Sequence, residues 1–244
     1  MKINFAIIFI LSLSSCLLGQ TNSFKDLNEF SLWIMNYYKA PERNRLFEAF
    51  TFATSSQEIA QAGSRTIAMS FFASCLRNDP GKLKEFYDNL SVATDTNLIY
   101  GFGYVLWLIQ TDTSLQMFNQ FKNLNQQNKY KEDFESLTKI NPINIWTDPI
   151  VEAEHLDYLW ADFFATGNEQ SIRKIITKLI DLNSKDQVDK ITANSAKWSL
   201  TSNAITHDTV FQVCNEERET IKDKKIRKAL DEIIKVATKE RDNK

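Results

Sequence analysis

The sequence LDYLWADFFATGNEQSIRKIITKL, residues 156–179, contains two helices and the turn that joins them. Apolar side chains recur every three or four residues on both sides of the turn, which is the period of an α-helix with one buried face. Gly167 is suited to end the first helix, because glycine adopts a left-handed backbone conformation without steric cost. Asn168 is suited to begin the second helix, because its side chain accepts a hydrogen bond from a free backbone N–H. The stretch therefore predicts a helical hairpin.

The same unit of helix, short turn and helix recurs along the chain. The differences between successive turn positions are 38, 33, 56 and 40 residues, for turns centred near Pro41, Asp79, Asp112, Asn168 and Asp208. Steps of this size are typical of α-solenoid arrays, in which each hairpin buries its apolar face against the next. We expect an all-α fold of stacked helical hairpins, α-solenoid-like. An irregular helical bundle built from the same hairpins is the alternative.

Composition agrees with a helical fold. The 244 residues include only 6 Gly and 4 Pro, too few for the turns of a β-sandwich, a barrel or a Gly-rich phosphate loop. We expect one α-helical domain over residues 22–244, with an irregular insertion at about 126–150 that leaves room for a short helix at 132–138. Gly101 and Gly103 lie within an apolar helical stripe, where small residues permit close helix packing.

The first 19 residues have the pattern of a secretory signal peptide. Lys2 precedes an unbroken apolar run, and serines follow it. The run is shorter than the roughly 20 apolar residues that a membrane-spanning helix needs. Two processing sites remain open. Cleavage after Gly19 would release an ordinary mature chain, whereas the sequence LSSC ending at Cys16 resembles a bacterial lipobox, whose cysteine is acylated. Both predict export, to the periplasm or the medium, with membrane attachment only through Cys16.

The net charge bears on nucleic-acid binding, and the cysteines bear on whether a disulfide forms. Removal of the leader loses Lys2 and changes the formal net charge from −2 to −3, which disfavours nucleic-acid binding because that requires a basic face. Cys75 and Cys214 would remain after ordinary cleavage. They could form one disulfide, but each lies on an apolar stripe, so two buried free thiols are favoured.

Residues suited to catalysis or metal binding are few. The two histidines, His155 and His207, lie on different hairpins. Glu152, Asp157 and Asp162 could join His155 in a metal site, but they are better interpreted as a solvated helix face, and we expect no metal and no cofactor. A Cys214–His207 pair is disfavoured, because we expect Asp208 to begin a new helix between them. Four tryptophans fall on apolar stripes and are expected in the core, namely Trp33, Trp107, Trp160 and Trp198; Trp146 lies in the irregular stretch.

Two longer phrases carry a resemblance. LDYLWADFFATG at residues 156–167 and AKWSLTSNAITH at residues 196–207 resemble an uncharacterised bacterial family of helical proteins, whose members combine the segments LxxLWxxFFATG and AxWSLxxNAxxH. FFASCLRNDP at residues 71–80 fits the first half of that family, so the resemblance covers roughly residues 40–215. It implies a common helical fold, loosely similar to tetratricopeptide-like repeats, and no established activity. The positions characteristic of tetratricopeptide repeats are not matched.

Trp198, Asn203 and His207 are polar or aromatic groups on one predicted helix, at spacings of 5 and 4 residues. Asn203 and His207 face the same side, as a buried hydrogen-bonded pair or as part of a ligand site. We expect a non-enzymatic exported protein that binds a protein or peptide partner or serves as a scaffold. The alternative is an envelope enzyme with its site near His155, Asn203 and His207, and it requires these groups to converge.

Overall fold

A computed structural model describes residues 24–61, 64–124 and 129–243, so the predicted leader and residues 126–128 of the insertion lie outside the described part. The described residues form thirteen α-helices and three short 3-10 helices, and they contain no strand. The prediction of an all-α fold is confirmed. No described helix is long and apolar enough to cross a membrane.

The helices fall into an N-terminal and a C-terminal series. The N-terminal series consists of α1 (Leu27–Asn36), η1 (Tyr37–Lys39), η2 (Arg43–Arg45), α2 (Leu46–Ser55), α3 (Gln57–Gln61), α4 (Arg65–Arg77), α5 (Pro80–Leu90), α6 (Thr96–Ile109), α7 (Asp112–Leu124) and α8 (Lys131–Leu137). The C-terminal series consists of α9 (Ala153–Thr166), α10 (Glu169–Thr177), η3 (Lys178–Asn183), α11 (Gln187–Thr206), α12 (Asp208–Thr220) and α13 (Lys224–Asp242).

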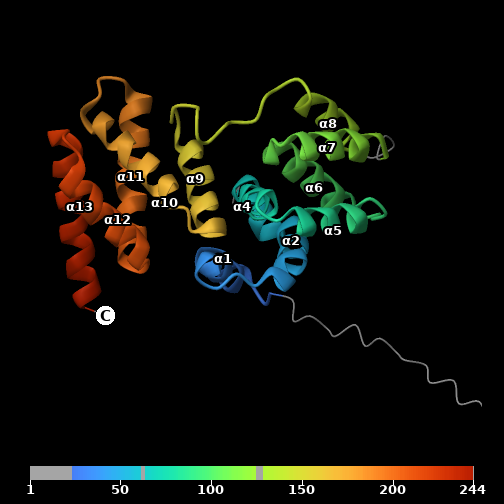
Figure 1. Ribbon diagram of the computed structural model, residues 1–244, viewed down its shortest axis with the longest axis horizontal. Helices are drawn as coiled ribbons and strands as arrows, with labels where there is room; N and C mark the ends of the chain where they lie inside the picture. Colours follow the sequence, from blue (N-terminus) through green and yellow to red (C-terminus); the bar gives the residue numbers. More distant parts are fainter. Residues whose placement is uncertain (1–23, 62–63, 125–128, 244) are drawn as a thin grey trace, which may run out of the picture.

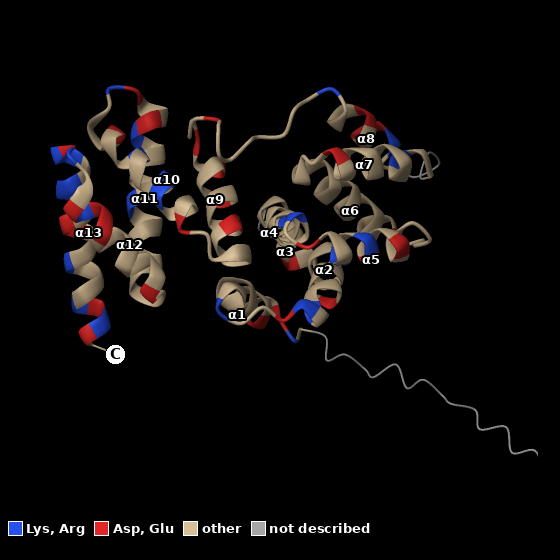
Figure 2. Ribbon diagram, in the orientation of Figure 1, with Lys and Arg blue, Asp and Glu red and all other residues tan. Residues whose placement is uncertain are grey.

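The helices are arranged in an elongated row rather than around one centre (Figure 1). From one end, α7 packs on α6, α6 on α4, and α4 on α9; α9 then contacts α10 and α11, and α13 covers α11 and α12 at the other end. Both series therefore meet at α9. In Figure 2 acidic and basic residues alternate along α13, as expected of a solvated outer face.

Several of the predicted helix ends are confirmed. The Asp79 carboxylate accepts a hydrogen bond from the Lys82 N–H at 3.0 Å, the Asn168 side chain caps α10, and Gly167 ends α9 at a φ of 72°. The helix break that we expected at Asp208 is present, but the cap residue is His207 rather than Asp208. The chain leaves helical geometry at His207, whose φ of −120° and ψ of 117° are extended, and Asp208 is the first residue of α12. Asp208 instead pairs with Arg241 near the end of α13.

Aromatic rings fill the core of the N-terminal series. Phe50, on α2, lies edge-on to Phe72 and Phe86 with ring centroids 5.3 and 5.6 Å away, and Phe102 lies edge-on to Phe121 at 5.3 Å. All five side chains are buried. Edge-to-face pairs of this kind add about 0.5–1.5 kcal/mol each to the gain from burying apolar area.

The short helix in the insertion and the state of the two described cysteines also agree with the predictions from sequence. The short helix predicted at 132–138 is present as α8, and the irregular stretch after it is held down by Lys174, whose Nζ donates to the carbonyls of Ile145 and Asp148 at 2.6 and 2.7 Å. Trp146 on this stretch is partly exposed. Cys75 and Cys214 are both free and buried, which confirms the interpretation as buried thiols.

Glycines in α6 allow two helices to approach closely. A Cβ added at Gly101 would lie 2.6 Å from the Thr54 Cγ2 on α2, and a Cβ at Gly103 would overlap the buried ring of Phe134 on α8. Gly81, at the exposed start of α5, has space for a methyl group. The prediction of close packing at Gly101 and Gly103 is therefore confirmed.

We expect Gly103→Ala to lower the free energy of unfolding by about 1–3 kcal/mol, because the Phe134 ring must move within a filled core. Gly81→Ala is the matched control and should stabilise by up to about 1 kcal/mol, because alanine loses less backbone entropy on folding. Urea denaturation followed by circular dichroism measures both. Equal midpoints for Gly103→Ala and the wild type would contradict the packing argument.

Candidate functional site

An apolar groove lies where the two series meet. Its volume is about 420 Å³, and α1, the α3–α4 region, α9 and α11 form its walls. Phe30, Ile34 and Met35 line it from α1, Phe71 lines it from α4, and Phe164 lines it from α9. The helices α1, α4 and α11 all pack on α9, so α9 contacts three other helices that bound the groove.

Two of the residues singled out in the sequence, Trp198 and Asn203, line this groove. Trp198 is 74% exposed, so the expectation that it belongs to the core is wrong. Val188 and Ile191, which precede Trp198 on the same face of α11, are also exposed. A helical period shows that residues share a face, but it does not show whether a neighbour covers that face.

Asn203 lies deeper on the same wall. Its amide donates to the Ser199 carbonyl one turn earlier, at 3.0 Å. The buried side-chain pair that we considered between Asn203 and His207 is not formed; the two residues are joined by the His207 backbone N–H, which donates to the Asn203 carbonyl at 2.8 Å.

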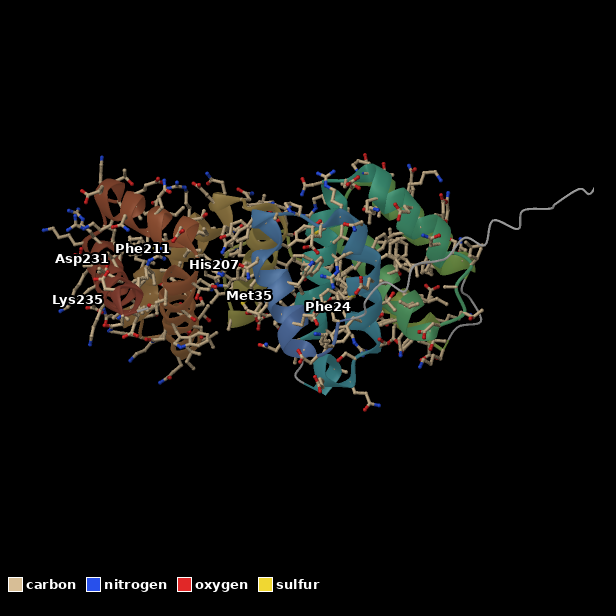
Figure 3. The ribbon with its side chains drawn as sticks, turned by 90° about the horizontal axis from the view of Figure 1, so that it is seen from below. Phe24, Met35, His207, Phe211, Asp231 and Lys235 are labelled. Atoms are coloured by element: carbon tan, nitrogen blue, oxygen red, sulfur yellow. The ribbon has the colours of Figure 1, made fainter. Side chains whose placement is uncertain are left out.

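His207 lies behind the groove wall at the junction of α11 and α12, and in Figure 3 it is seen at the boundary between the C-terminal helices and α1. Its side chain is fully buried. Nδ1 is 3.2 Å from the Tyr38 hydroxyl, and the ring lies 5.4 Å from the ring of Phe164, which lines the groove. Nε2 is buried and has no hydrogen-bond partner among the described residues. Burial lowers the pKa of His207 to about 4, and Lys39 acts in the same direction.

His155 lies elsewhere. It is buried at the start of α9, where its Nδ1 accepts a hydrogen bond from the Val151 N–H at 3.0 Å. His207 instead contacts Phe163 and Phe164, near the end of the same helix. Eight residues separate His155 from Phe163, which is about 12 Å along a helix axis. The structure thus does not bring the two histidines together, as the envelope-enzyme hypothesis requires.

The carboxylates near His155 do not form a metal site with it among the described residues. Asp162, expected on a solvated face, is buried between helices and accepts hydrogen bonds from the hydroxyls of Ser74 and Ser171 at 3.0 and 2.8 Å. These bonds join α9 to α4 and α10. The described residues contain no cluster of three or more His, Cys, Asp or Glu arranged to hold a metal ion.

Asp157 lines the groove, and no hydrogen bond or ion pair joins it to another described residue. Burial raises the pKa of Asp157, and the nearby negative charge of Glu154 raises it further. Three residues later on the same face, Trp160 is buried in the groove wall, and its indole N–H has no acceptor among the described residues. Buried donors without partners are rare in folded proteins.

The cysteines are poor nucleophiles. Burial raises the pKa of Cys214 to about 12, and burial also raises the pKa of Cys75 well above that of an ordinary thiol. A reactive cysteine needs a pKa near or below neutrality, because the thiolate is the attacking species. Neither thiol therefore supports covalent catalysis at neutral pH.

The sequence did not single out the α1 side of the groove. A signal for α9 was present, since apolar residues there exceed one stripe and such a helix must be covered on several sides. Nearly every residue from Leu156 to Ala165 is buried. Which helices provide the cover is a tertiary property that the pattern of α9 does not contain.

Comparisons with family models, with curated proteins and with solved structures each found no match.

We expect stability to fall on acidification through His207. The folded protein holds the imidazole neutral down to about pH 4, whereas the unfolded chain takes up the proton below about pH 6.5. The unfolded state therefore binds more protons between these values, and lowering the pH from about 7.5 to about 5 should cost about 2 kcal/mol through this residue.

Denaturant titrations at the two pH values measure this loss. His207→Gln cannot be protonated, so its pH-dependent loss should be smaller than that of the wild type by that amount. Identical pH dependence in His207→Gln and the wild type would refute the assignment.

Proposed function

We propose that this protein is a non-enzymatic, exported peptide-binding protein, which holds an apolar segment of a protein partner in the groove between α1, α4, α9 and α11. The observation that carries the proposal is Trp198, a tryptophan 74% exposed at the edge of an apolar groove. Tryptophan is among the residues that contribute most to binding energy in protein interfaces, because it buries a large rigid surface.

The groove has the size and lining of a binding site. Its volume of about 420 Å³ falls within the range of pockets that hold small ligands or a few side chains. Apolar side chains make up most of the lining, and the polar groups are few and scattered. An apolar segment of a partner would bury surface from both chains, which is the main driving force of association.

The supporting helices favour a preformed site. α9 forms one wall, and its Asp162 is tied to α4 and α10 by two buried hydrogen bonds. A rigid wall reduces the conformational entropy lost on binding. Extended helical stacks commonly present such surfaces to peptides.

Nothing in the groove supports catalysis with comparable strength. The two histidines lie toward opposite ends of α9, and both described thiols are buried and protonated. General acid–base chemistry needs groups within hydrogen-bond reach of one reacting atom. We therefore favour binding over the envelope-enzyme alternative.

Selection from a random displayed peptide library, with the wild-type protein as bait, tests the proposal. We expect enrichment of apolar peptides, which synthetic fluorescent copies should confirm by anisotropy. Trp198→Ala should weaken the binding of these peptides about tenfold or more, as expected when a large aromatic contact is removed. Ser202→Trp should also weaken it, because Ser202 is an exposed residue of the groove wall and a large side chain there occupies the space.

Trp146→Ala is the matched control. It also removes an exposed tryptophan, but one that lies outside the groove, so affinity should not change. Denaturation curves should show all three variants folded, because the altered side chains are exposed. The absence of enriched peptides, or equal binding by all variants, would rule out the groove as a peptide site.

Export is the part of the proposal that rests on residues 1–19 alone. Labelling cells with radioactive palmitate, with Cys16→Ala as the control, distinguishes the two processing sites. Label on the wild type only would identify a lipoprotein anchored at Cys16. An unlabelled mature chain that begins at Gln20 would identify ordinary signal-peptide cleavage.

A further inference from the structure

We infer that the segment held in the groove carries a lysine or arginine side chain between apolar residues, and that this cation pairs with Asp157. The inference rests on the proposed function and specifies the chemistry of the partner. It follows from the position, the charge and the missing partners of Asp157.

Asp157 is the one ionisable side chain among the described residues that line the groove. The other polar members are four serines, one asparagine and the indole N–H groups of Trp160 and Trp198, and none of these carries a charge. An apolar groove with a single carboxylate has a negative potential that neighbouring groups do not cancel. The groove therefore attracts cations and repels anions.

The protein itself provides no cation for Asp157. No described lysine or arginine forms an ion pair with it, and the charge that acts on it is that of Glu154, which is also negative. Glu154 accepts a hydrogen bond from the Tyr158 hydroxyl at 2.6 Å and so remains beside Asp157. A buried structural carboxylate is expected to have donors, as Asp162 has in the same helix, whereas Asp157 is half-buried and has none among the described residues.

The positions on α9 define what must surround the cation. Asp157, Trp160, Ala161 and Phe164 are spaced by 3, 1 and 3 residues, so they lie on one face of the helix and all line the groove. A cation bound at Asp157 therefore has apolar surface directly beside it. A long lysine or arginine side chain satisfies both requirements, because its methylene groups pack on apolar surface while its charged end reaches the carboxylate.

Pairing with a cation also lowers the free energy of the ionised Asp157 carboxylate. The carboxylate is partly removed from water and stands near a like charge, and each of these raises the free energy of the ionised form. An incoming cation relieves both effects, and its hydrogen bonds are charge-assisted. An acidic side chain at the same place would meet a third negative charge, so the groove should discriminate by charge as well as by apolar contact.

Three synthetic peptides test the inference. They share the sequence Ac-Ser-Leu-Phe-X-Leu-Ile-Ser-NH2, with X as lysine, norleucine or glutamate, and carry a fluorophore on a C-terminal linker. We expect the wild-type protein to bind the lysine peptide about tenfold more tightly than the norleucine peptide, as for one charge-assisted pair partly shielded from water. The glutamate peptide should bind weakest.

Asp157→Asn should reduce the preference for lysine over norleucine to about twofold or less, while the norleucine peptide keeps its affinity. Glu154→Gln is the matched control. It removes a charge of the same sign one turn away, outside the described lining of the groove, and should lower the preference for lysine far less than Asp157→Asn does. Raising the salt concentration should weaken the lysine peptide selectively in the wild type and not in Asp157→Asn.

The outcomes separate the two proposals. Equal affinity of the wild type for the lysine and norleucine peptides would overturn the cation inference and leave peptide binding in place. A preference that survives in Asp157→Asn would also overturn it, because another group would then hold the cation. If none of the peptides binds and library selection also fails, both proposals are wrong.

Discussion

The arrangement of this protein depends on one constraint: helix α9 must be covered on almost every side. Nearly all of its residues from Leu156 to Ala165 are buried, including a carboxylate, Asp162. A carboxylate so placed is costly unless it is hydrogen-bonded, and the hydroxyls of Ser74 and Ser171 each donate to one of its oxygens. Because Ser74 belongs to α4 and Ser171 to α10, the same polar contact fixes both series of helices against α9.

The groove is a consequence of this arrangement. α1, α4 and α11 each pack on α9, and the space left between them is lined by apolar side chains from all four helices. The wall is reinforced from behind, where His207 fills the junction of α11 and α12 and contacts Phe164 and Tyr38. The contact to Tyr38 also ties the C-terminal series to η1, directly after α1. The groove is therefore framed by parts of the chain that are far apart in sequence.

Much of this could be predicted from the sequence, and the limits have a physical cause. Helices, their caps at Asp79 and Asn168, the stop at Gly167 and the close packing at Gly103 follow from local conformational preferences and side-chain size. Trp198 and Asn203 were singled out and do line the groove, whereas His155 lies apart from it. The predictions for Trp198 and Asp162 were wrong for one shared reason. Amphipathic period assigns residues to faces of a helix, but cover on each face depends on neighbours that are distant in sequence.

Asp157 and Asp162 allow a comparison within a single helix. They are five residues apart and burial raises the pKa of both carboxyl groups, but Asp162 is buried whereas Asp157 is half-buried, and their partners differ. At Asp162 two hydroxyl donors oppose the effect of burial, and Arg77 adds a favourable charge. At Asp157 the described residues provide no donor or cation, and Glu154 adds an unfavourable charge. The environment of Asp157 lacks the compensation that Asp162 has, and our inference is that a cation carried by the bound segment would supply it.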